Sequence, residues 1–122
     1  MDEPIISLDT ITNKIIAWGV SRMIVQNSTA LAQSRKTIEE VHEMVEAATL
    51  EQYRPTVSSR ELLKDAIGDV FVTLVMAAEC NELTINECIQ KAYNDIKGRK
   101  GHLRPDGVFV KEEVRDGNQG TG

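Results

Sequence analysis

The chain has 122 residues, 41% of them hydrophobic and 27% charged, with a formal net charge of -5. This composition is typical of one globular domain, and the acidic balance without a basic block argues against a nucleic-acid partner. Cys80 and Cys88 lack the spacing of a metal-binding pair and favour reduced thiols over a disulfide framework. The acidic start lacks the basic region of a signal peptide, and no apolar run could span a bilayer. We therefore expect a cytoplasmic protein with no membrane partner.

A first helix is predicted over residues 9–26, with an apolar face made by Ile11, Ile15 and Trp18. Trp18 shares its face with Arg22. This pair is compatible with a core aromatic beside a surface cation, and also with one wall of a ligand site. The sequence leaves both readings open.

A second helix is predicted over residues 29–52. Glu40 and Glu43 share one face of this helix, and Glu40 borders its apolar stripe, so the two are candidates for an inward-facing pair. Glu39 and Glu46 are expected to point further outward, into solvent. The apolar stripe, which we expect to be buried, consists of Leu31, Ile38, Val41, Val45 and Ala48.

Residues 53–59 are predicted to be a connector, because Pro55 disfavours a helix before it. The segment from Ser58 to Glu61 matches a capping box and predicts a third helix that continues to about Glu79. Glu61 is thereby given a structural role, which competes with a role as a ligand.

The third helix carries Glu61, Asp65 and Asp69 on one face, and the buried-type apolar run 70–78 follows directly. Carboxylates next to such a run need cations, because an unpaired buried charge costs several kcal/mol. Lysine or arginine from a neighbouring helix could supply the charge, as could a metal ion. Gly68 beside them indicates either close approach by a backbone or ligand, or a tight helix crossing.

A fourth helix is predicted over about residues 85–97, opened by a capping box between Thr84 and Glu87 and ended by Gly98. Cations near its end suit the helix dipole, and they could also form an anion site. These cations are Lys91, Lys97, Arg99 and Lys100.

The C-terminal segment changes character after the fourth helix. Residues 105–107 predict a turn, and residues 108–110 predict at most a short extended piece. We therefore predict a single all-α domain over residues 1–122, a bundle of about four helices. Its core spans about residues 9–100, and an irregular or β-like tail follows over 101–122.

Carboxylates from two helices are typical of a site for a hard divalent cation such as Mg²⁺, which shares its oxygen ligands with water and phosphates. The chain has no P-loop, EF-hand loop or nucleophile elbow. A di-iron bundle would need two Glu-x-x-His pairs, but only Glu39 and His42 form one, and His102 lies in the tail. These residues alone do not name a substrate.

Several segments resemble the MazG-like nucleoside triphosphate pyrophosphohydrolases. Glu39-Glu-Val-His-Glu43 fits the EExxE signature, and Asp69 with the apolar helix after it resembles the end of the ExxD motif. The chain is similar in particular to the short MazG-like proteins common in bacteriophages. This similarity covers about residues 15–112 and rests on residues 65–69, 92–96, 99–101 and 107–111, with Trp18, Arg22, Gln33 and Lys36 at matching places.

The resemblance implies an all-α fold that hydrolyses a (d)NTP to the (d)NMP and pyrophosphate, in the control of nucleotide pools. It implies Mg²⁺ as the cofactor, with Mn²⁺ as a substitute, and assembly as a homodimer or homotetramer. For a phage-encoded chain the location would be the host cytoplasm.

The family's four metal ligands correspond to Glu40, Glu43, position 66 and Asp69, but position 66 is an alanine here. Asp65 is the nearest substitute, and Glu61 is the next. Glu40, Glu43, Asp65 and Asp69 are thus the expected catalytic, metal-binding set. Candidates for contacts to phosphate, base or sugar are Trp18, Arg22, Lys36, Lys91, Asn94, Arg99 and Lys100.

Two alternatives belong to other classes of function. The loss of a carboxylate at Ala66 favours a catalytically weakened module that binds nucleotides. A helical oligomerisation module, whose acidic residues are merely solvated, is the other. Incubation with nucleotides and Mg²⁺ discriminates the three.

Overall fold

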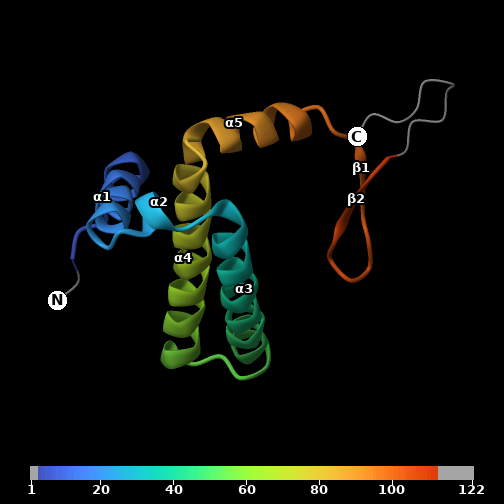
Figure 1. Cartoon of the computed structure of the whole chain (residues 1–122). Coiled ribbons are helices and arrows are strands. Elements are labelled where there is room, and N and C mark those ends of the chain that lie inside the picture. Colours follow the sequence, from blue (N-terminus) through green and yellow to red (C-terminus); the bar gives the residue numbers. More distant parts are fainter. Residues whose placement is uncertain (1–2, 113–122) are drawn as a thin grey trace, which may run out of the picture. The chain divides into compact units, whose positions relative to one another are not determined.

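The computed structural model describes residues 3–112 (Figure 1). It is 71% helical, which confirms the all-α prediction. The described residues form five helices and one two-stranded sheet. The chain divides into two compact units, residues 1–88 and residues 89–122.

The first predicted helix is two helices in the structure, α1 (Leu8–Ser21) and α2 (Ile24–Asn27). Ser7 caps α1, because its hydroxyl accepts a hydrogen bond from the Thr10 amide at 3.2 Å. Met23 has a left-handed backbone, with φ of 64°, and this residue separates the two helices. The prediction of one continuous helix was therefore wrong. The residue with the left-handed backbone is a methionine, and not the glycine that usually marks this conformation in a sequence.

The buried face of α1 is also rotated from the predicted one. Thr12 and Gly19 are buried, whereas Ile11 and Trp18 remain substantially exposed. A side chain at Gly19 would overlap the thioether of Met76, so the glycine permits close approach between α1 and α4 (Val57–Cys80). The core of this unit consists of Val75, Met76 and Ile85, surrounded by Ile15, Ile16, Ile24, Val25, Phe71 and Val72.

Helix α3 (Ala30–Tyr53) and helix α4 lie side by side as a long antiparallel hairpin (Figure 1). The expected adjacency of the two acidic helices is therefore confirmed. Two contacts fix their register: Thr37 and Thr73 share a hydrogen bond of 2.7 Å, and the Ser59 hydroxyl donates to Glu51 at 3.0 Å.

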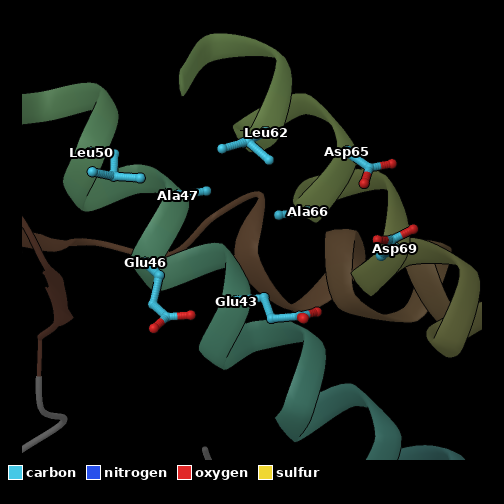
Figure 2. Close-up of a pocket in the computed structure, with 8 residues that line it drawn as sticks. All are labelled: Glu43, Glu46, Ala47, Leu50, Leu62, Asp65, Ala66 and Asp69. Atoms are coloured by element: carbon cyan, nitrogen blue, oxygen red, sulfur yellow. The ribbon is translucent and has the colours of Figure 1, made fainter. Parts of the chain in front are cut away.

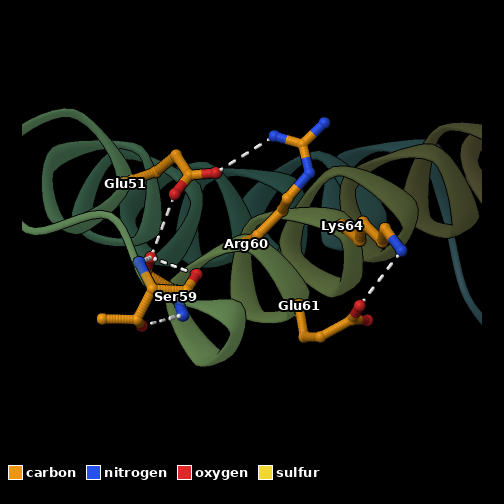
Figure 3. A network of polar contacts seen from close by, with 6 residues as sticks. Glu51, Ser59, Arg60, Glu61 and Lys64 are labelled. Carbon is orange, nitrogen blue, oxygen red and sulfur yellow. Dashed lines mark hydrogen bonds and ion pairs between the residues drawn. The ribbon is translucent and has the colours of Figure 1, made fainter.

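The cap of α4 differs from the predicted one. Thr56 is the N-cap, and it forms a reciprocal capping box with Ser59, with hydrogen bonds of 2.8 and 3.0 Å. Ser58 lies inside the helix instead, and Glu61 forms an ion pair with Lys64 at 3.1 Å (Figure 3). Glu61 is therefore free of the capping role that the sequence suggested.

The apolar stripe of α3 is not buried as predicted. Ile38 is 68% exposed and Val45 is 56% exposed. The side chains of α3 that are buried or half-buried follow a different and more polar line, which consists of Gln33, Thr37, Glu40, Met44, Ala47 and Glu51. The helix therefore packs against α4 through a mixed polar face and leaves its most apolar face uncovered within the described chain.

Helix α5 (Ile85–Ile96) starts in the first unit and confirms the predicted capping box. The Thr84 amide donates to the Glu87 carboxylate at 3.3 Å, and the Glu87 amide donates to the Thr84 hydroxyl at 3.1 Å. No helix in the described part of the chain combines the length and apolar character needed to cross a bilayer.

The second unit contains the rest of α5 and an antiparallel hairpin, β1 (Gly101–Leu103) with β2 (Phe109–Lys111). Gly107 takes a φ of 90° in the connecting turn, a conformation that favours glycine. The short extended piece predicted near residues 108–110 is confirmed. Its partner β1 was not predicted, because three residues carry too little alternation to be recognised.

Candidate functional site

A cavity of about 470 Å³ lies against the hairpin of α3 and α4. Its acidic lining consists of Glu43 and Glu46 from α3 with Asp65 and Asp69 from α4 (Figure 2). The rest of the lining is apolar: Ala47, Leu50, Leu62 and Ala66. Three of the four residues predicted as the catalytic set therefore share one cavity.

The register of the hairpin brings these acids together. Because Thr37 lies opposite Thr73 and Glu51 lies opposite Ser59, the segment around Glu43 is level with the turn of α4 that carries Asp65. Asp65 and Asp69 are one turn apart on α4, so both reach the same side of the helix.

Glu40, the fourth predicted residue, is one helical turn before Glu43 and does not line the cavity itself. Its side chain is only 13% exposed, and Lys36 Nζ lies 3.5 Å from its Oε1. Its other oxygen, Oε2, is buried without a hydrogen-bond partner among the described residues. A buried carboxylate oxygen without a donor is costly, and a cation would satisfy it.

The pKa of Glu40 is raised above its ordinary value. The largest cause is the nearby Glu43 carboxyl group, with which a protonated Glu40 could share a hydrogen bond, and burial and repulsion from Glu43 act in the same direction. Lys36 opposes the shift. The two carboxyl groups of the EExxE segment therefore interact directly and favour a shared positive charge.

The pKa of Asp69 is raised as well. Burial is the largest cause, followed by the negative charges of Asp65 and Glu40, while Lys36 lowers it. The field of Glu40 therefore reaches across from α3 to α4. Carboxylates from both helices repel one another here, and Lys36 only partly compensates them.

The donor set suits a hard divalent cation, because every charged group at the cavity is a carboxylate with oxygen donors. The unpartnered Oε2 of Glu40 and the repulsion between Glu40 and Asp69 also favour a bound cation. Within residues 3–112, no group of three or more histidine, cysteine, aspartate or glutamate side chains is arranged to hold an ion in the present geometry.

Ala66 is buried between the two helices, and it presents no oxygen to the cavity that it lines. Asp65 lies beside it and lines the same cavity, whereas Glu61 does not. Glu61 is exposed and paired with Lys64. A side chain at Gly68 would meet nothing within 4 Å among the described residues, so a helix crossing within residues 3–112 does not explain that glycine.

Glu46 is the site residue that the sequence reasoning missed. It was expected to point into solvent, but it lines the cavity together with Glu43. The available signal was its spacing of three residues from Glu43, which places both on neighbouring turns of one face.

The predicted substrate contacts fall in three places, none of them in the lining of the cavity. Trp18 and Arg22 lie at the end of α1, where the Arg22 amide donates to the Trp18 carbonyl at 3.0 Å. Lys36 pairs with Glu40, one helical turn before the cavity residue Glu43. The second unit carries the remaining four: Lys91, Asn94, Arg99 and Lys100.

Comparisons of the chain with protein-family models, with curated proteins and with solved structures found no match.

Proposed function

We propose that the chain is a Mg²⁺-dependent nucleoside triphosphate pyrophosphohydrolase of the MazG-like kind, which cleaves a (d)NTP to the (d)NMP and pyrophosphate. The observation that carries the proposal is the cavity against α3 and α4, into which Glu43, Asp65 and Asp69 converge beside a buried Glu40. Its residue set agrees with the one that the resemblance implies, apart from position 66.

The raised pKa values of Glu40 and Asp69 support a cation at this place. Carboxylates that repel one another lose that penalty when a divalent ion binds between them. Such an ion, when bound, neutralises the triphosphate and polarises the α-phosphoryl group. Glu40, Glu43, Asp65 and Asp69 would hold it, and Glu46, which lines the same cavity, would orient a water molecule.

Lys36, which pairs with Glu40, would meet a phosphate of the substrate. Lys91, Arg99 and Lys100 stay candidates for phosphate contacts from the sequence. The substrate would come from the nucleotide pool of the cytoplasm, and the protein would work as a homodimer or homotetramer.

The test is an incubation of the purified full chain with each NTP and dNTP, with Mg²⁺ or with EDTA, followed by separation of the products. We expect a monophosphate and pyrophosphate in Mg²⁺ and neither in EDTA. Release of a diphosphate and inorganic phosphate, or turnover that EDTA leaves unchanged, would contradict the proposal.

Ala66 favours a second candidate, a module that binds metal and nucleotide without turnover. The alanine leaves the cavity with one carboxylate fewer than the family pattern at this position. For this candidate, calorimetry would detect Mg²⁺-dependent binding of a nucleotide in a preparation that forms no product.

A further inference from the structure

A second cavity, of about 300 Å³ and here called the α1 cavity, is lined by residues of α1, the end of α4 and the start of α5. Its polar lining consists of Asp9, Thr12, Asn13, Glu79, Thr84 and Asn86. It shares no residue with the acidic cavity against α3 and α4. Glu79 follows Asp69 by ten residues, which corresponds to ~15 Å along α4. The two cavities are therefore separate places on the first unit.

Helix α1 forms one wall of the α1 cavity. One face of this helix supplies, at the i, i+3, i+4, i+7 spacing, the residues Asp9, Thr12, Asn13 and Ile16. Ile16 packs against the core cluster that includes Ile85, the first residue of α5. This core contact holds the wall against the start of α5 and places the polar residues of the same face in the cavity.

Thr12 is the most deeply buried polar side chain of the α1 cavity. The residue is 5% exposed, and its hydroxyl has no hydrogen-bond partner among residues 3–112. The hydroxyl is not sealed from solvent in the way that Oε2 of Glu40 is, so it opens into the cavity that Thr12 lines. A nearly buried hydroxyl without a partner costs free energy, and a ligand that hydrogen-bonds to it would remove that cost.

The charges of the lining favour a cation over an anion. The lining contains two carboxylates, Asp9 and Glu79, and no lysine, arginine or histidine. Neither carboxylate forms an ion pair with another described residue. Glu79 lies in the last turn of α4, which contains no basic residue, and this end of a helix carries partial negative charge. A positive group would therefore be stabilised beside Glu79.

The two helix starts at the cavity do not reverse this preference. A helix N-terminus carries partial positive charge and attracts anions. Asp9 already occupies the first turn of α1. At the start of α5, Glu87 accepts hydrogen bonds from the Thr84 amide at 3.3 Å and from the Thr84 hydroxyl at 3.0 Å. Both starts thus carry a carboxylate of the chain itself, and a further anion would meet repulsion.

The size of the α1 cavity and its apolar lining favour an organic cation over a metal ion. The volume of about 300 Å³ is roughly ten times the ~30 Å³ that one water molecule occupies in the liquid. Ile16 and Ile85 line the same cavity, and their side chains gain free energy from contact with carbon rather than with a hydrated ion. A ligand with both ammonium groups and methylene groups matches this lining.

We propose that the α1 cavity binds an aliphatic diamine. One ammonium group meets Asp9, the other meets Glu79, and the methylene chain between them lies on Ile16 and Ile85. Because the two carboxylates come from different helices, two positive groups joined by a flexible chain satisfy both.

The neutral polar groups of the lining complete the site. An ammonium group has three donors, and each needs an acceptor when water is displaced. The hydroxyl of Thr12 accepts one of them, and the side-chain oxygens of Asn13 and Asn86 are further acceptors. None of these residues lines the acidic cavity, so the site does not depend on whether the chain hydrolyses nucleotides.

Calorimetric titration of the full chain with putrescine tests the proposal. Saturating Mg²⁺ is present, so that the diamine does not bind to the acidic cavity against α3 and α4. We expect saturable binding of putrescine. Butylamine, which has one ammonium group, should bind ~10-fold more weakly, and butanediol, which has none, should not bind, because charged hydrogen bonds contribute most. Absence of saturable putrescine binding, or equal affinity for butylamine, would overturn the proposal.

Two variants assign the binding to the α1 cavity. Glu79→Gln should weaken putrescine binding by ~10-fold, because it removes one of the two charges that hold the ligand. The matched control is Glu82→Gln, which removes the same charge at an exposed residue outside the lining and should keep the wild-type affinity. Unchanged affinity in Glu79→Gln, or an equal loss in the control, would overturn the site.

Thr12→Val tests the buried hydroxyl. It should weaken putrescine binding by ~3-fold or more, because an acceptor is lost. The melting temperature of the ligand-free variant should not fall, since the hydroxyl has no partner within residues 3–112. A lower melting temperature with unchanged affinity would overturn the role of Thr12 in the site.

A titration with Ca²⁺ separates a diamine from a metal ion. We expect Ca²⁺ to bind no more weakly to Glu79→Gln than to the wild type. Binding of Ca²⁺ that is tighter than that of putrescine and is lost in Glu79→Gln would assign the α1 cavity to a metal ion and overturn the proposal. Circular dichroism checks that each variant remains helical.

Discussion

At the scale of the residue, the structure separates two carboxylates that the sequence could only rank. Asp65 lines the cavity with Asp69, and its charge contributes to the raised pKa of Asp69. Glu61 is 62% exposed, points to Lys64 and takes no part in the cap of α4 (Figure 3). The choice of Asp65 as the substitute at Ala66 therefore has a structural reason, while its role as a ligand stays a prediction.

Asp65→Asn should lower turnover by ~10-fold or more and raise the Mg²⁺ concentration needed for half-maximal rate, because it removes charge from the metal-binding set. Asp69→Asn should behave alike. Steady-state rates over a Mg²⁺ titration measure both effects.

Glu61→Gln is the matched control, one turn earlier on the same helix. It should leave turnover unchanged and cost at most ~0.5 kcal/mol, since an exposed i,i+3 ion pair contributes little. If Glu61→Gln abolishes turnover while Asp65→Asn is silent, the assignment of the fourth carboxylate is reversed.

Helical periodicity predicted that Glu40 and Glu43 share one face and that Glu61, Asp65 and Asp69 share another, and the short connector predicted that the two helices are adjacent. Of these five residues, Glu43, Asp65 and Asp69 line the cavity. Glu46 escaped prediction for a physical reason. Whether a carboxylate on the border of a face meets solvent or a cavity depends on the register of the neighbouring helix, which contacts such as Thr37–Thr73 set.

At the scale of the element, the bounds of α3, α4 and α5 were predictable to within a few residues, but the break between α1 and α2 and the cap of α4 were not. Both Thr56 and Ser58 can serve as an N-cap by residue type. The choice is made by a tertiary contact: Ser59 also donates to Glu51 on α3, which in turn pairs with Arg60 at 3.2 Å (Figure 3). A single sequence does not display that contact.

Thr56→Ala should destabilise the protein by ~1 kcal/mol, because the Ser59 amide loses its acceptor at the start of the helix. Ser58→Ala should change the free energy of unfolding by only a few tenths of a kcal/mol, since Ser58 is exposed inside the helix. Urea denaturation of the two variants measures the difference. Equal losses, or a larger loss at Ser58, would argue against the observed cap.

At the scale of the whole molecule, the periodicity of α3 identified an apolar stripe but not what covers it. The sequence predicted that this stripe is buried within one chain. In the structure, α4 packs instead against the more polar side of α3, which contains Thr37, Glu40 and Glu51. Periodicity cannot distinguish a face that is buried within a chain from one that is buried between chains. The same ambiguity affected α1, whose buried line passes through Thr12 and Gly19.

Repulsion between the carboxylates at the cavity should lower the free energy of unfolding of the metal-free protein at neutral pH. Glu40 and Asp69 have raised pKa values, so the folded state binds their protons more tightly than the unfolded state does. The stability that these groups contribute is present below their ordinary values of 4.5 and 3.8, and it is lost as the pH rises through the raised values.

Asp69→Asn should therefore melt at a higher temperature than the wild type at pH 7 in EDTA. The difference should disappear below pH 3.8, where Asp69 is protonated in both states. Mg²⁺ at pH 7 should raise the melting temperature of the wild type more than that of the variant. A wild type more stable than Asp69→Asn in EDTA would contradict the repulsion.

The contact between Gly19 and Met76 allows the opening of the packing between α1 and α4 to be measured through the oxidation of Met76. Met76 is 1% exposed, so a peroxide can convert its thioether to a sulfoxide only when the packing around it opens, for example when α1 moves away from α4. Met23, which is 55% exposed, should oxidise first and supply the reference rate. Gly19→Ala should speed the oxidation of Met76 but not that of Met23, as peptide mass spectrometry would measure. The oxidation rate of this one buried sulfur atom would thus measure how often the packing around Met76 opens.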